Sequence, residues 1–118
     1  MTKGYGTGVA RVRPLALRLP RAYEALVRDS IKFRVGQIVF VALSPDETLM
    51  GFGFPKEERD ALVESEPHKF QLPRTSDLRY NWVTAKLDAI DDVELAELVH
   101  GAWTMCVPKS VAATRPNP

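Results

Sequence analysis

The residues that could carry chemistry are bases interleaved with aromatic rings. One group surrounds Phe33, and a second runs through segment 69–86. Cationic side chains hold phosphates by charge and rings stack on bases, so the pattern predicts a nucleic-acid contact surface. An alternative is that the rings are core residues and the bases lie at the edge of that core. The predicted nucleic-acid contacts are Lys32, Arg34, Lys69, Arg74, Arg79 and Lys86, and the predicted pocket-lining or stacking residues are Phe70, Tyr80 and Trp82.

Catalytic and metal sites are not expected. His68 and His100 are far apart in the sequence with no ligand pattern around either, and the single cysteine, Cys106, excludes an internal disulfide and a multi-cysteine zinc site. Gly4, Gly6 and Gly8 lack the spacing and the preceding strand of a dinucleotide-binding loop. No nucleophile, base and orienting group can be assembled. We therefore expect a non-enzymatic protein without a metal or a cofactor.

The charge of the chain is unevenly distributed along its length. The formal net charge is only +1, which by itself argues against a polyanionic partner. Residues 1–40, however, hold eight bases and two acids, a net +6, whereas residues 41–118 hold eight bases and thirteen acids, a net −5. This asymmetry is compatible with a basic surface, because opposite charges distant in sequence need not be neighbours in space.

Length and composition predict one small domain of 118 residues that can bury its core without disulfides. The longest apolar run, from Ile38 to Leu43, is far shorter than the ~20 residues that span a bilayer, so no membrane association is expected. A cytoplasmic location is the default prediction. Residues 1–8 are predicted to be a flexible lead-in and residues 110–118 a C-terminal tail.

Hydrophobic spacing predicts the elements that position these side chains. A helix is expected within 9–19, either starting near Arg13 or running longer with a kink at Pro14. Alternation and turn residues then predict strands at 23–28, 31–35, 37–43 and 48–54, a helix from Pro55 to before Pro67, and an irregular segment at 68–80. A strand at 82–87 and a helix capped by Asp91, with Glu94 as its capping-box partner, complete the chain.

Short connections between the early strands require antiparallel pairing. The order α-β(3–4)-α-β(1–2)-α predicts a two-layer α+β fold, in which helices pack on one face of an antiparallel sheet. Strand alternation places Lys32 and Arg34 on one face of their strand, and Trp82 and Lys86 on one face of theirs.

Several segments together resemble the MmcQ/YjbR family of small bacterial proteins, over roughly residues 9–109. The resembling segments are Lys32-Phe-Arg-Val-Gly-Gln-Ile-Val-Phe40, Gly53-Phe-Pro-Lys-Glu-Glu-Arg59, Asn81-Trp-Val-Thr-Ala-Lys-Leu-Asp88 and Val107-Pro-Lys109. The resemblance implies a fold similar to frataxin and to secretion chaperones, no established enzyme activity, and a frequent DNA-binding label. Gln37 stands where many relatives have a lysine, and Trp103 stands where a Ser-Tyr pair is common.

Three functions are compatible with these observations. The first is weak, salt-dependent DNA binding through the basic strand face and the loop that follows Lys69. The second is a protein-interaction module, which the chaperone-like fold implies; it would bind a protein partner or form a homodimer. The third is a small-ligand site between sheet and loop. We adopt DNA binding as the hypothesis that the structure has to support.

Overall fold

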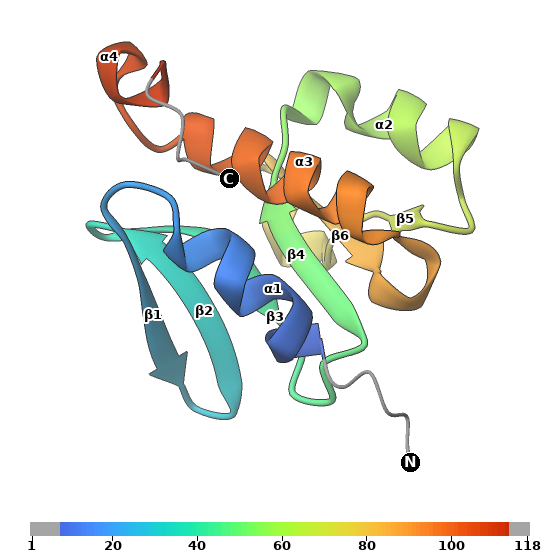
Figure 1. The fold of residues 1–118 in the computed structure, drawn as a ribbon. Helices are drawn as coiled ribbons and strands as arrows, with labels where there is room; N and C mark the ends of the chain where they lie inside the picture. The colour runs from blue at the N-terminus through green and yellow to red at the C-terminus, as the bar shows by residue number, and fades with distance from the viewer. Residues whose placement is uncertain (1–7, 114–118) are drawn as a thin grey trace.

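The computed structural model describes residues 8–113, which form a six-stranded antiparallel sheet with helices packed on it (Figure 1). The strand order is β1-β2-β3-β4-β6-β5, and each neighbouring pair is antiparallel. The predicted α+β class is therefore confirmed. The elements are α1 (Gly8–Leu17), β1 (Ala22–Val27), β2 (Ser30–Val35), β3 (Ile38–Leu43), β4 (Leu49–Gly53), α2 (Lys56–Ser65), β5 (Phe70–Gln71), the 3₁₀ helices η1 (Thr75–Asp77) and η2 (Leu87–Ala89), β6 (Trp82–Lys86), α3 (Asp92–Thr104) and α4 (Lys109–Ala112).

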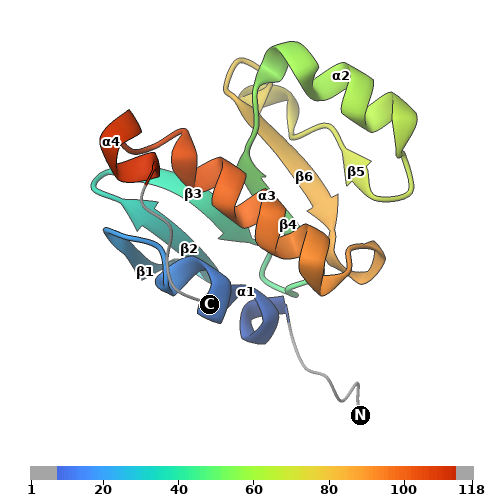
Figure 2. The same ribbon diagram turned by 45° about the horizontal axis from the view of Figure 1, so that its top comes forward.

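Alternating burial gives the sheet two different faces. In β2, Phe33 and Val35 are buried, whereas Lys32 and Arg34, which alternate with them, are only half-buried. The buried residues of the other strands lie beneath α1 and α3, which cross the same side of the sheet in Figures 1 and 2. We call this side the covered face. The buried ring of Trp103 on α3 donates from Nε1 to the carbonyl of Pro20 at 2.8 Å, and this bond joins α3 to the segment between α1 and β1.

The beginning of the described chain corrects one prediction. Gly8 was expected in a flexible lead-in, but it is buried and opens α1, whereas residues 1–7 lie outside the described residues. A Cβ at Gly8 would collide with the carbonyl oxygen of Glu47 and would lie 2.6 Å from Leu87 Cδ1. Glycine is therefore required by the close approach of α1 to the turn between β3 and β4.

Gly8→Ala is expected to destabilise the protein by about 1–3 kcal/mol, because the added methyl group forces the helix and the turn apart. Urea denaturation followed by circular dichroism measures this change. Gly36→Ala is the comparison variant. A Cβ at Gly36 meets no atom within 4 Å, so any loss of stability there comes from the left-handed φ of +59° and not from a collision. An unchanged midpoint for Gly8→Ala would contradict the close approach.

The ends of the helices agree with the predictions in some places and differ in others. Pro14 lies inside α1, so the longer of the two predicted helices is right. Asp91 caps α3 by accepting from the Glu94 amide at 2.8 Å, as predicted, but the Glu94 carboxylate does not complete a capping box and binds Lys69 at 2.9 Å instead. The predicted tail is also wrong at its start, because residues 109–112 form α4 and Val111 packs against the core. Residues 114–118 lie outside the described part.

Strand β1 forms one edge of the sheet, and the two-residue strand β5 forms the other. The segment 68–80, predicted to be irregular, thus contains a short strand and one 3₁₀ turn. Arg21 and Arg28 flank β1 with left-handed backbone angles, φ of 67° and 57°. Within residues 8–113, every helix is too short or too polar to span a membrane.

Candidate nucleic-acid interface

The face of the sheet opposite α1 and α3 carries the bases that the sequence placed on strands. We call it the open face and define it by the strand positions that alternate with the buried ones. Lys32 pairs with Ala42, Ala42 with Gly51, and Gly51 with Thr84, so these four residues form one row across β2, β3, β4 and β6. Three strand spacings separate the ends of the row, about 14 Å. The open face consists of Tyr23, Ala25, Val27, Ser30, Lys32, Arg34, Val39, Ala42, Leu49, Gly51, Gly53, Gln71, Trp82, Thr84 and Lys86.

Lys32 and Arg34 stand on the open face without a carboxylate partner. No ion pair joins either side chain to an acid within residues 8–113, and Arg34 Nε is buried without a hydrogen-bond acceptor. The open face contains no Asp or Glu, because the one acid of β1, Glu24, pairs with Phe33 on the covered face. Neither cation is therefore neutralised by a carboxylate of the described residues.

Trp82 lies on the same face and crosses the neighbouring strand. A Cβ at Gly51 would lie 2.6 Å from Trp82 Nε1, so the indole rests directly against the backbone of β4. Glycine is the residue that permits this contact, because a side chain at position 51 would collide with the indole. The ring is half-buried, and the surface that remains is available for stacking.

Lys86 lies at the end of β6, farther from the unpaired bases. Its Nζ donates to the carbonyl of Pro67 at 3.4 Å. It also lines an open cavity of about 380 Å³, whose lining includes an acid, Asp88. The lining residues are Thr48, Leu49, His68, Lys86, Asp88 and Ala89. Lys86 is therefore less available to a phosphate than Lys32 or Arg34.

Two predicted site residues have structural roles instead. Lys69 Nζ lies 2.9 Å from Glu94 Oε1 and 3.0 Å from Glu66 Oε1, and its bonds to Glu94 and Glu66 raise the pKa of the ammonium group. Phe70 is 1% exposed and packs edge-on to Phe52, with ring centroids 6.3 Å apart. The Phe70 ring points from β5 into the core, so it cannot stack on a base or line an open site. The prediction of Phe70 as a pocket-lining or stacking residue is wrong.

The loop before β6 holds the remaining predicted contacts. Arg74 is exposed and reaches Asp77 at 3.5 Å. The Arg79 guanidinium lies 4.9 Å from the centroid of the Tyr80 ring and donates to its hydroxyl at 2.8 Å. Tyr80 is half exposed and comes two residues before Trp82. The loop thus presents a ring and a cation at the end of the strand that carries Trp82.

Sequence reasoning missed Arg59, which holds this loop in place. The side chain is 7% exposed and donates to the carbonyls of Leu78 at 2.8 Å, Tyr80 at 3.0 Å and Trp82 at 3.1 Å. A usable signal existed, because Arg59 shares a helix face with the apolar Leu62 and Val63 at i+3 and i+4. A base on an apolar helix face indicates a buried cation with acceptors around it.

The bases of α1 do not join the open face. Arg11 donates to the carbonyls of Leu87 at 2.8 Å and Ile90 at 2.5 Å, and to Asp92, while Arg13 forms a two-pronged pair with Glu24 at 2.7 and 2.8 Å. The bond to Arg13 lowers the pKa of Glu24. Among the N-terminal bases, Arg11 and Arg13 thus make structural contacts on the covered side, whereas Lys32 and Arg34 lie on the open face.

Comparisons with known proteins agree with this architecture. The crystal structure of protein DR2400 of Deinococcus radiodurans, whose domain is classified as DUF419, superposes with a TM-score of 0.73, at 20% identity, over 93% of this chain and 85% of that chain. This likeness supports the fold. A search of curated proteins finds no significant match. The YjbR family model matches residues 17–105, and the chain accordingly belongs to the YjbR family.

Proposed function

We propose that the protein binds nucleic acid through its open face, with phosphates held by Lys32 and Arg34. The observation that carries the proposal is the pairing state of these two bases: both lie on a face without acids, and neither has a carboxylate partner within residues 8–113. Trp82, Tyr80 and Arg79 add rings and a cation for stacking on bases. We propose DNA as the nucleic acid, and the cytoplasm as the location of the protein.

The proposed role is binding without catalysis. Burial raises the pKa of the Cys106 thiol, whereas an activated cysteine nucleophile needs a lowered pKa. Cys106 instead packs at the end of α3 with its Sγ 3.6 Å from the carbonyl of Ala102. The part of the chain that the structure describes gathers no group of three or more His, Cys, Asp or Glu residues suited to a metal ion.

The double substitution of Lys32→Glu with Arg34→Glu tests the proposal. We expect affinity for a fluorescein-labelled oligonucleotide, measured by anisotropy at about 100 mM salt, to fall at least ten-fold. The slope of log K against log salt should become shallower by about 2, since each lost phosphate contact removes roughly 0.9.

The matched control is Arg18→Glu with Lys109→Glu, which changes the net charge equally at exposed positions outside the open face. This control should keep most of the affinity. Equal losses in the two double variants would show that only total charge matters and would remove the open face from the proposal. Unchanged affinity in the Lys32 and Arg34 variant would have the same effect.

A further inference from the structure

A cation and an aromatic ring lie in one row of the open face. Lys32 is in register, through Ala42, with Gly51, and the indole of Trp82 lies against Gly51. Two strand spacings, about 10 Å, therefore separate the backbone of Lys32 from the ring. Ala42 lies between them, and its methyl side chain leaves room for a ligand that contacts both.

The two indoles of the protein differ in their surroundings. Trp103 is fully buried, and its Nε1 donates to the carbonyl of Pro20. Trp82 is half-buried, and its Nε1 has no hydrogen-bond acceptor within residues 8–113. Indoles of this second kind, with an apolar body and a free donor, are enriched at interfaces. Trp82 thus resembles a binding residue and Trp103 a core residue.

The width of the sheet decides which form of nucleic acid can bring its bases to Trp82. The ring belongs to β6, which is the fifth of six strands and has neighbours on both sides. Five strand spacings make the sheet about 24 Å wide, whereas the major groove of B-DNA is about 12 Å wide and admits a two-stranded ribbon. A duplex therefore meets the open face with its phosphates, and its paired bases stay out of reach of the ring. A single strand can turn its bases onto the ring.

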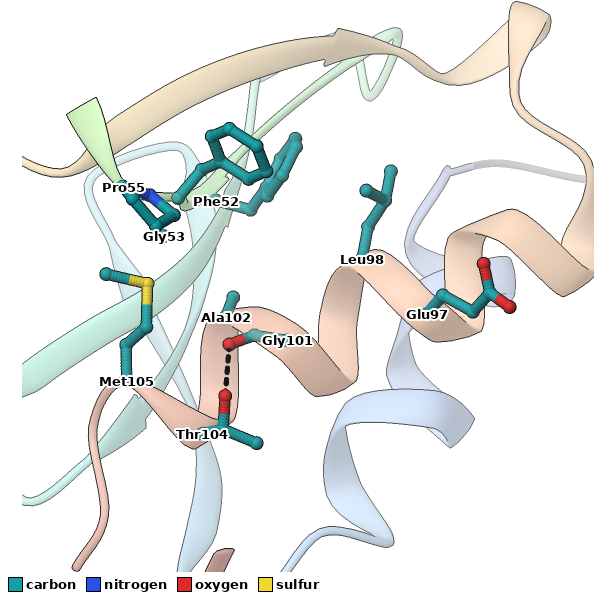
Figure 3. A pocket seen from close by; sticks show the side chains of 10 residues that line it. Phe52, Gly53, Pro55, Glu97, Leu98, Gly101, Ala102, Thr104 and Met105 are labelled. Atoms are coloured by element: carbon teal, nitrogen blue, oxygen red, sulfur yellow. Dashed lines mark hydrogen bonds between the residues drawn. The ribbon is translucent and has the colours of Figure 1, made fainter. Parts of the chain in front are cut away.

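The covered side differs in its chemistry. A cavity of about 240 Å³ lies there between the end of β4 and the second half of α3 (Figure 3). Leu98 and Ala102 extend from α3 toward Phe52, and the carboxylate of Glu97 points away from them (Figure 3). No Lys or Arg of the described residues lines this cavity. A polyanionic strand therefore finds cations beside an aromatic ring on the open face.

We propose that the open face binds single-stranded DNA in preference to duplex DNA, with a base stacked on Trp82 and neighbouring phosphates on Lys32 and Arg34. This inference rests on the proposed function and names the form of the nucleic acid. At the 3.4 Å rise of a stacked strand, the separation of about 10 Å between Lys32 and the ring corresponds to about three nucleotides. Every base has a π-face, so we expect little sequence preference.

The test compares three fluorescein-labelled probes of about 20 nucleotides at about 100 mM salt: oligothymidylate, its duplex with the complementary strand, and an abasic strand. Charge alone favours the duplex, because phosphate contacts release more counterions from B-DNA than from single strands. We expect oligothymidylate nevertheless to bind about five-fold or more tightly than the duplex. The abasic strand keeps the phosphates, so it should bind about ten-fold more weakly than oligothymidylate with the same slope of log K against log salt.

Trp82→Leu provides the second arm of the experiment, because leucine still covers Gly51 but has no ring. Affinity for oligothymidylate should fall about ten-fold with the salt slope unchanged, whereas Trp82→Phe should keep most of the affinity. Met105→Ala is the matched control, since it removes an exposed apolar side chain beside the cavity of the covered side and should bind like the unsubstituted protein. If Trp82→Leu does not fold, the abasic strand decides.

Three results would each overturn the single-strand inference: a duplex bound as tightly as oligothymidylate, an abasic strand bound as tightly, or an unchanged affinity of folded Trp82→Leu. The proposed function has its own outcome in the same assays. It stands if the double variant of Lys32 and Arg34 loses affinity for oligothymidylate and duplex alike. Absence of binding to every probe would remove both proposals.

Discussion

Replacing Arg59 with methionine is expected to destabilise the protein by about 3–5 kcal/mol, because three backbone carbonyls lose their buried cationic donor at once. The guanidinium binds the carbonyls of Leu78, Tyr80 and Trp82, and methionine fills a similar volume without donating to any of them. A charged donor shared by several acceptors contributes more than a neutral hydrogen bond. Arg59→Lys keeps the charge but loses the forked geometry of the guanidinium. Its free energy of unfolding should therefore lie between those of the unsubstituted protein and Arg59→Met.

Urea denaturation followed by far-UV circular dichroism measures the loss. Lys56→Ala is the matched control on the same helix, because the exposed Lys56 Nζ donates to one carbonyl, that of Arg79, at 3.1 Å. Its cost should stay below about 1 kcal/mol. A loss of similar size in Lys56→Ala and Arg59→Met would contradict the role that we assign to the buried guanidinium.

Trp103→Ala is expected to cost about 3–5 kcal/mol and to lower the melting temperature strongly, because the largest fully buried side chain leaves a cavity. It also removes the bond from the indole to the carbonyl of Pro20. Trp103→Phe separates these two contributions, since phenylalanine retains most of the apolar contact but cannot donate to Pro20.

Thermal denaturation by calorimetry, with matched urea titrations, quantifies both Trp103 variants. Val93→Ala serves as the control, because Val93 lies on the same helix with 73% of its surface exposed. We expect Val93→Ala to change stability by less than about 0.5 kcal/mol. A Trp103→Ala protein as stable as this control would show that α3 does not depend on its buried ring.

Local patterns were sufficient to predict the elements and much of the core. Leu95, Val99, Ala102 and Trp103 have the i, i+4, i+7, i+8 spacing of a single helix face, and all four are buried. Strand alternation separated Lys32 and Arg34 from Phe33, because the two faces of a strand differ at every residue. These inferences depend on neighbours within a few residues, which the sequence displays directly.

Long-range partners could not be read in the same way. Arg11 binds Asp92 at a sequence separation of 81 residues, and Lys69 binds Glu94 at a separation of 25. The residues next to either base in the sequence therefore could not reveal its acidic partner. The sequence also could not show that Trp82 and Lys32 share a face, because this depends on the order of the strands and on the registers of three pairings. Phe70 was misjudged because a two-residue strand has no periodicity.

The ends of strand β1 have a consequence for how the protein behaves at high concentration. An unpaired strand edge is a template on which other chains can add and aggregate. Arg21 and Arg28, with their left-handed backbones, stop the regular ladder at both ends of β1 and place a positive charge beside each end. The opposite edge, β5, offers only two residues. We therefore expect both edges of the sheet to resist the addition of further strands.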